Sequence, residues 1–403
     1  MPTVVLLVPT STYRARDFVD AARALGADLV VATDEAPAIA DPTGTRTIAV
    51  PLDDVDAAAR ELLALDDRRG VDAVVALDDR GVEVAAAAAE RLGLPHNPPT
   101  AVAATRDKSR LRDALAAGEV AQPRYARLDD GNDRAAAIAA AARVGGYPVV
   151  VKPVGLTASQ GVIRADGEEA VAAAARRAQA IAGGGPLLVE QYVPGAEVSA
   201  EGLLRAGRLE VLAVFDKPDP LEGPYFEETI FVTPSRLPAS VQAELARVTQ
   251  DACAALGLLE GPIHAELRVS DSRVVLLEVA ARSIGGLCAR ALRFGAGISL
   301  EEVILRHALG MSLEGLAREP EASGVMMLPI PRAGTLVAVR GQDAARAVDG
   351  IVGLEITVPP GRVVQPPPEG DRYLGFLFAR GRTPEIVEGA LRRAHAALEI
   401  ELA

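Results

Sequence analysis

The sequence predicts a chain of mixed α/β and α+β class, with an N-terminal parallel sheet, an α+β middle part and a C-terminal α+β extension. Three observations lead to this prediction. Over the first hundred residues, apolar runs alternate with Ala- and Leu-rich segments of helical periodicity, as in βαβ units. From Pro123 onward strand-like runs become denser. The length of 403 residues exceeds one ordinary hydrophobic core, so two or three domains are expected.

The N-terminal part contains three apolar runs and three helical patterns. The apolar runs lie at 4–8, 29–32 and 71–77, and the helical patterns at 18–25, 55–65 and 82–92. Pro95, Pro98 and Pro99 then interrupt regular structure. We therefore expect a βαβ domain at 1–95.

The middle part mixes strand-like runs with longer helical patterns. The strand-like runs lie at 148–152, 187–192, 197–204, 210–216, 263–269 and 274–279. The helical patterns lie at 101–117, 133–144, 167–182, 238–256 and 300–309. Short strands and Pro-rich turns follow from about residue 322, so we place the second domain at 96–320 and the third at 321–403.

Composition narrows the class of function. The formal net charge of −13 argues against nucleic acid and anionic membranes as partners, and favours a small molecule. No basic leader and no span of 18 apolar residues is present, so a cytoplasmic location is expected. Cys253 and Cys288 form no CxxC pair, and we expect two buried thiols rather than a disulfide or a zinc site.

Lysine is scarce in this sequence, because only Lys108, Lys152 and Lys217 occur among 42 basic residues. A lysine kept where arginine is the rule indicates a role that arginine cannot fill. No GxxxxGK[ST] loop exists. Lys152 instead ends a strand-like run and precedes a small, Gly-containing loop at 155–162, which can surround phosphate oxygens with a charge and backbone N–H groups.

Acidic residues follow in two further patterns. The segment 190–199 reads as a strand, a Pro-Gly turn and another strand, in which backbone groups can contact an adenine and a carboxylate can hold ribose hydroxyls. Glu266 and Glu278 lie on two consecutive predicted strands, where paired carboxylates can share a hard cation such as Mg²⁺. Arg282, four residues after Glu278, can neutralise charge during phosphoryl transfer.

Taken in order, these motifs resemble those of the ATP-grasp superfamily over about residues 96 to 320. The segments 215–218, 223–228 and 233–235, with a C-terminal segment at 331–335, look like the L-amino acid ligase group. The resemblance implies an ATP-grasp fold and a homodimer. It also implies an ATP-dependent ligase that activates a carboxylate as an acyl phosphate and joins it to an amine, with amino acids as substrates.

The resemblance also implies roles for individual residues. Nucleotide binding falls to Lys108, Lys152, Ser159, Gln160, Gly161, Glu190, Gln191, Tyr192, Val193 and Glu197, with Glu197 on the ribose. Glu266 and Glu278 would hold Mg²⁺, with Mn²⁺ as the alternative, and Arg282 and Lys152 would be catalytic. Strand position and turn chemistry, rather than the resemblance, make His264, Ser283, Gly285, Gly286 and Glu227 candidates for substrate contacts. Ala280 stands where many relatives carry Asn, so it offers no oxygen to a second metal ion.

Other interpretations stay open at this point. His264 can make a core hydrogen bond instead of orienting a substrate, 282–286 can be a plain Gly-rich turn, and Glu227 can lie in a solvated loop. Another ATP-grasp reaction, either transfer to a nucleotide precursor or carboxylation, is an alternative function. A noncatalytic ATP-binding protein is the alternative from a different class.

Overall fold

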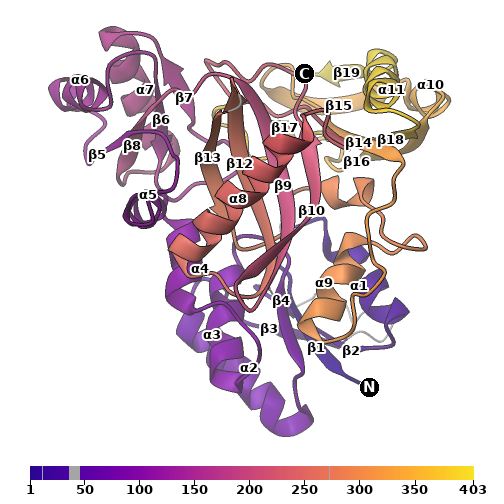
Figure 1. The fold of residues 1–403 in the computed structure, drawn as a ribbon. Coiled ribbons are helices and arrows are strands. Elements are labelled where there is room, and N and C mark those ends of the chain that lie inside the picture. Colours follow the sequence, from indigo (N-terminus) through magenta and orange to yellow (C-terminus); the bar gives the residue numbers. More distant parts are fainter. Residues whose placement is uncertain (11, 36–45, 272) are drawn as a thin grey trace.

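The computed structural model describes residues 1–10, 12–35, 46–271 and 273–403 (Figure 1). The N-terminal part is a parallel sheet with the order β3-β2-β1-β4. Its elements are β1 (Thr3–Leu7), α1 (Ala15–Ala24), β2 (Asp28–Thr33), β3 (Arg46–Ala49), α2 (Val55–Arg69), β4 (Ala73–Ala76) and α3 (Val82–Leu92). The predicted parallel sheet is confirmed. Strand β3 was not predicted, because it is an edge strand whose four residues are all partly or fully exposed.

The centre of the molecule is an eight-stranded antiparallel sheet with the order β13-β12-β9-β10-β11-β14-β18-β16. Its strands are β9 (Ala196–Arg205), β10 (Arg208–Asp216), β11 (Ile230–Thr233), β12 (Gly261–Ser270), β13 (Arg273–Ala280), β14 (Ala322–Met327), β16 (Ile351–Ile356) and β18 (Gly375–Gly381). Helix α8 (Ala239–Leu256) packs against β13, β10 and β9. Because the sheet continues from β11 to β14, it joins both sides of residue 320. The proposed boundaries at 95 and 320 stay predictions.

Two smaller sheets flank the central one. The first has the order β5-β8-β6-β7 and packs against α6 and α7, and the second has the order β17-β15-β19. The first unit comprises β5 (Tyr125–Leu128), α6 (Arg134–Arg143), β6 (Val149–Pro153), β7 (Ile163–Ala165), α7 (Glu168–Ile181) and β8 (Leu187–Gln191). The C-terminal part adds β15 (Gly334–Arg340), α10 (Gln342–Arg346), β17 (Val363–Val364), α11 (Pro384–Ala396) and β19 (Glu399–Leu402).

The single helical stretch expected at 101–117 is wrong, because two helices occupy it. Helix α4 (Pro99–Arg106) ends at Asp107, whose backbone is extended with φ −117° and ψ 106°. The Asp107 carboxylate accepts N–H bonds from Ser109 and Arg110, and so caps α5 (Lys108–Ala117). The break therefore places Lys108 at the first position of a new helix.

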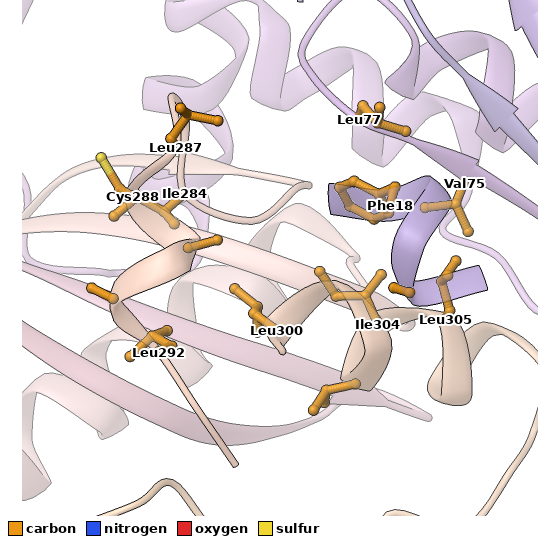
Figure 2. Close-up of a cluster of buried hydrophobic side chains, with 14 of the residues drawn as sticks. Phe18, Val75, Leu77, Ile284, Leu287, Cys288, Leu292, Leu300, Ile304 and Leu305 are labelled. Carbon is orange, nitrogen blue, oxygen red and sulfur yellow. The ribbon is translucent and has the colours of Figure 1, made fainter. Parts of the chain in front are cut away.

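A hydrophobic cluster joins the N-terminal part to the segment that follows β13 (Figure 2). Phe18 from α1 and Leu77, which follows β4, lie on one side of it. Ile284 lies on the other side, whereas Ile304 lies next to Phe18 and belongs to α9 (Leu300–Ala308), which packs against α1. A short 3-10 helix, η1 (Cys288–Ala291), contributes Cys288. The packing fixes the loop at 282–286 against the end of β4.

Both cysteines are buried free thiols, as expected, and burial raises the pKa of Cys253 to about 12. Within the described residues, no helix has both the length and the apolar character needed to cross a bilayer.

Candidate functional site

All three parts of the chain line one cavity of about 590 Å³. The sequence-predicted residues that line it are Lys108, Lys152, Ser159, Glu190, Gln191, Tyr192, Val193, Glu197, His264, Glu266, Glu278, Arg282, Gly285 and Gly286. Among the described residues, the lining does not include Gln160, Gly161, Glu227 or Ser283, and Glu228 lines the cavity next to Glu227. The N-terminal part also contributes lining residues for which the sequence predicts no role, among them Arg14, Asp78 and Asp79.

Lys152 and Glu190 form a buried ion pair across adjacent strands β6 and β8, with 2.7 Å between Nζ and Oε2. Arg112 on α5 donates to the same carboxylate from Nε at 2.7 Å and from Nη2 at 3.1 Å. Burial opposes ionisation of Glu190, but Arg112 and Lys152 outweigh it and lower its pKa to about 2. Arg112 was not predicted as a site residue, although it lies four residues after Lys108 and so on the same helix face.

The glycine-containing loop at 155–162 is held from two sides. The Lys108 ammonium donates to the carbonyl oxygen of Leu156 at 2.7 Å. The N–H of Gly161 donates to the carbonyl oxygen of Pro368 at 2.9 Å, and the Gln160 side-chain amide donates to that of Glu369 at 3.3 Å. Gly161 has φ +69°, and a Cβ there would meet Pro153 at 2.8 Å, so only glycine fits.

Glu266 and Glu278 are directly paired residues on the antiparallel strands β12 and β13. Both side chains line the cavity, so the structure brings together the two carboxylates that the sequence places twelve residues apart. The Lys108 ammonium lies 3.3 Å from Glu278 Oε1. Two facing carboxylates beside a lysine suit a hard cation that also contacts phosphate.

Lys217 is a buried ammonium group between three carboxylates. Its Nζ lies 2.8 Å from Glu197 and 3.0 Å from Glu266, and it also forms an ion pair with Glu228. Burial lowers the pKa of Lys217, but the three carboxylates outweigh this and raise it well above the ordinary value. Burial raises the pKa of Glu228 to about 7 despite Lys217.

Glu197, the residue expected on the ribose, has a second cationic partner that the sequence analysis did not identify. Arg268 on β12 donates to Glu197 Oε2 from Nη2 at 2.9 Å and from Nε at 3.1 Å. The sequence did contain a signal for this role of Arg268. It lies two residues after Glu266 on the same strand and therefore on the same face.

His264 forms a buried pair with Glu201, a residue of the neighbouring strand β9 that the sequence analysis missed. Burial opposes the charged ring, but Glu201 and Glu266 outweigh it and raise the pKa of His264 to about 9. The other oxygen of Glu201 accepts the N–H of Ile284 at 2.9 Å. His264 is therefore connected through Glu201 to the loop at 282–286.

Arg282 pairs with the N-terminal part of the chain. Its Nη2 lies 2.8 Å from Oδ2 of Asp79, which follows β4, and Arg106 lies 3.1 Å from the other oxygen of Asp79. Burial raises the pKa of Asp79, but the two arginines outweigh this and lower it to about 2. Asp79 could not be found from the sequence, because 203 residues separate it from Arg282.

Three family models match the chain in succession. The "ATP-grasp N-terminal domain" model matches residues 19–96, the "ATP-grasp domain" model matches 145–291, and the "L-amino acid ligase C-terminal domain 2" model matches 326–403. The chain is an ATP-grasp protein. The ATP-grasp fold expected from the motif order is thereby confirmed.

Relatives and solved structures agree with this assignment. The ATP-grasp protein is 30% identical to carnosine synthase 1 of Gallus gallus over 310 residues, covering 67% of this chain and 31% of that protein. It is 26% identical to the alanine–anticapsin ligase of Bacillus subtilis (strain 168) over 259 residues, covering 59% and 53%. The chain thus spans less than two thirds of either relative. The crystal structure of an L-amino acid ligase from Bacillus licheniformis superposes with a TM-score of 0.83 at 24% identity, covering 100% and 99%.

Proposed function

We propose that this ATP-grasp protein is an ADP-forming ligase that joins a carboxylate to an amine, with amino acids as substrates. One observation carries the proposal. Residues from six separate segments, expected to serve phosphate, adenine, ribose, metal and carboxylate, line the same cavity. The names of the relatives, a carnosine synthase and an alanine–anticapsin ligase, support the same class of reaction.

The nucleotide would lie between the β5-β8-β6-β7 sheet and the central sheet. Lys108, Lys152 and the loop bearing Ser159, Gln160 and Gly161 would contact phosphates. The segment from Gln191 to Val193 would line the adenine site. Glu190 has both oxygens engaged by Arg112 and Lys152, so we assign it the positioning of Lys152 rather than direct contact with adenine.

The residues present fit Mg²⁺. Glu266 and Glu278 supply the hard oxygen ligands that Mg²⁺ prefers, and they face each other across two strands beside Lys108. When bound, the ion would neutralise phosphate charge. Mn²⁺ would fit the same ligands. Ala280 offers no side-chain ligand, so any further coordination must come from Glu278, nucleotide or water.

The reaction would proceed in two steps, phosphoryl transfer followed by amide formation. A carboxylate oxygen attacks the γ-phosphorus of ATP, the bond to the β-phosphate oxygen breaks, and ADP leaves. The amine nitrogen then attacks the acyl carbon, phosphate leaves, and the nitrogen loses a proton. Lys152 and Arg282 would stabilise the transferring charge, while the loop at 155–162 excludes water from the acyl phosphate.

The test is ADP release with Mg·ATP across a matrix of amino acids and small carboxylates, with products identified by mass spectrometry. Activity should require two substrates and fall at least a hundredfold in Glu278→Ala, because a metal and phosphate contact is lost. Glu210→Ala, an exposed position on β10, is the matched control and should keep activity. Confirmed ATP binding without ADP release across the whole matrix would favour a noncatalytic binder, and bicarbonate-dependent release would favour a carboxylation.

Two further parts of the proposal concern the whole protein. We propose a homodimer, as the resemblance implies, which light scattering at several concentrations tests. We also propose a cytoplasmic location, which fractionation of the source cells tests.

A further inference from the structure

Arg14, which immediately precedes α1, is an unusual lining residue of the cavity. It is 3% exposed, and two of its five N–H donors have acceptors: Nη1 donates to Leu77 O at 2.6 Å and Nη2 to Ser283 Oγ at 2.7 Å. Its buried Nε has no acceptor among the described residues. In the described part of the chain, no carboxylate lies within 4.0 Å of this guanidinium.

The groups around Arg14 leave its charge only partly compensated. The strongest anionic influence is buried Glu301 on α9, followed by Glu201 and Asp78, while Arg282 repels it. The guanidinium carbon of Arg14 also lies over the Phe18 ring, 5.4 Å from the ring centroid, in a cation–π contact. Burial lowers the pKa of Arg14. A buried cation without a close partner is costly, so an anion that reaches it gains a strong interaction.

Arg282, which also lines the cavity, shares this property. Its Nε is likewise buried and has no acceptor in the described segments, although its Nη2 pairs with Asp79. Arg14 bonds the side chain of Ser283, the residue next to Arg282. Two neighbouring guanidinium groups with donors to spare form a site for a carboxylate, which can accept paired N–H bonds.

We propose that Arg14 binds the carboxylate that does not react, namely the α-carboxylate of the amino acid that supplies the amine. The inference rests on the proposed ligase function. Glu278, beside the expected γ-phosphate, and Arg282, four residues later, line the same cavity as Arg14. Arg14 is bonded to Ser283, the residue after Arg282, so Arg282 connects the expected phosphoryl-transfer centre to Arg14 along the chain. An amino acid held at Arg14 would present its amine toward the acyl phosphate.

The test compares α-carboxylates with α-amides. Glycine, L-alanine and L-phenylalanine are paired with their α-amides as amine donors for wild type, Arg14→Gln and Arg14→Lys. Wild type should prefer the carboxylate form by at least about tenfold in kcat/KM, because a charge-assisted bond is lost with the amide. Arg14→Gln should remove the preference, mainly by raising KM for the carboxylate form, and Arg14→Lys should keep part of it.

Arg16→Gln is the matched control, because Arg16 lies two residues away with a side chain that is 85% exposed, and it should keep the preference. Melting temperature and Mg·ADP affinity check that each variant is folded. A purely structural Arg14 would lower activity with both forms equally, and a preference that survives in Arg14→Gln overturns the inference.

The same compounds are also titrated calorimetrically in the presence of Mg·ADP. If wild type releases no ADP with these compounds or with any other pair of the substrate matrix, the ligase proposal fails while binding still decides the role of Arg14. Equal affinity of wild type for carboxylates and amides, together with absent turnover, would overturn both.

Discussion

His264 shows how the site sets the charge of a single residue. Its ring lies between Glu201 and Glu266, and two carboxylates favour its protonated form even though the ring is buried. The charged ring in turn stabilises Glu201, which holds the backbone of Ile284. The protonation state of one imidazole is therefore linked to the position of the loop at 282–286.

This linkage predicts a pH dependence of stability. The folded pKa of about 9 exceeds the unfolded value of 6.5, so the stabilisation is complete below pH 6.5 and is lost as pH rises through 9. We expect the free energy of unfolding of wild type, measured with urea in EDTA, to fall by up to about 3 kcal/mol over this window. His264→Gln should remove most of the decline. His96→Gln is the control, and an identical pH profile for wild type and His264→Gln would contradict the prediction.

Helix α5 begins at Lys108, a residue that lines the cavity. Asp107 caps the helix through the N–H groups of Ser109 and Arg110, and Lys108 and Arg112 then point to the cavity and to Glu190. The cap is a local feature, but its effect extends to residues that are far away in sequence. The geometry of the phosphate site thus depends on where one helix starts.

Removal of the cap should affect stability and ATP use together. We expect Asp107→Ala to lower the free energy of unfolding by about 0.5–2 kcal/mol. It should also raise KM for ATP, because the first turn of α5 frays and no longer fixes the position of Lys108. Asp54→Ala removes the equivalent cap of α2, where Asp54 accepts from Ala57, and should lower stability alone. Equal KM values in the two variants, measured by ADP release, would show that the cap does not position Lys108.

The sequence predicts the strands that carry the site better than it predicts the side-chain contacts between distant segments. The runs around Lys152, Glu266 and Glu278 have strong local patterns, and their strands appear where expected. The break at Asp107 was missed because both helices are Ala-rich and the cap is a single residue. Arg14, Asp79 and Glu201 could not be assigned, because the site residues that they contact, Ser283, Arg282 and His264, lie 269, 203 and 63 residues away and are brought near only by packing.

In the whole molecule, the β5-β8-β6-β7 unit, which carries the loop at 155–162, is bonded to the C-terminal part. Arg177 on α7 forms a two-bond ion pair with Glu369, at 2.7 and 2.9 Å, and the Gly161 N–H donates to Pro368. These contacts hold the loop at 155–162 over the cavity. Opening of the nucleotide site would require that they break.

Weakening this contact should let water reach the intermediate. We expect Glu369→Gln to raise ADP release in the absence of the amine by up to about fivefold, because an exposed pair contributes about 0.2–1 kcal/mol. Glu401→Gln breaks the exposed Arg340–Glu401 pair elsewhere in the C-terminal part and should have no such effect. The ratio of ADP to coupled product measures the change, and equal ratios in both variants would contradict it.

The hydrophobic cluster of Figure 2 has a consequence for building hybrid enzymes. Phe18 and Leu77 share one core with Ile284 and Ile304, so the first hundred residues cannot be exchanged between relatives as an independent cassette. A graft that transfers the N-terminal sheet without residues 284–305 would leave mismatched surfaces near Arg14 and Ser283, because Arg14 contacts the Phe18 ring and Ser283 precedes Ile284. Altered selectivity through recombination would therefore require that both segments are inherited together.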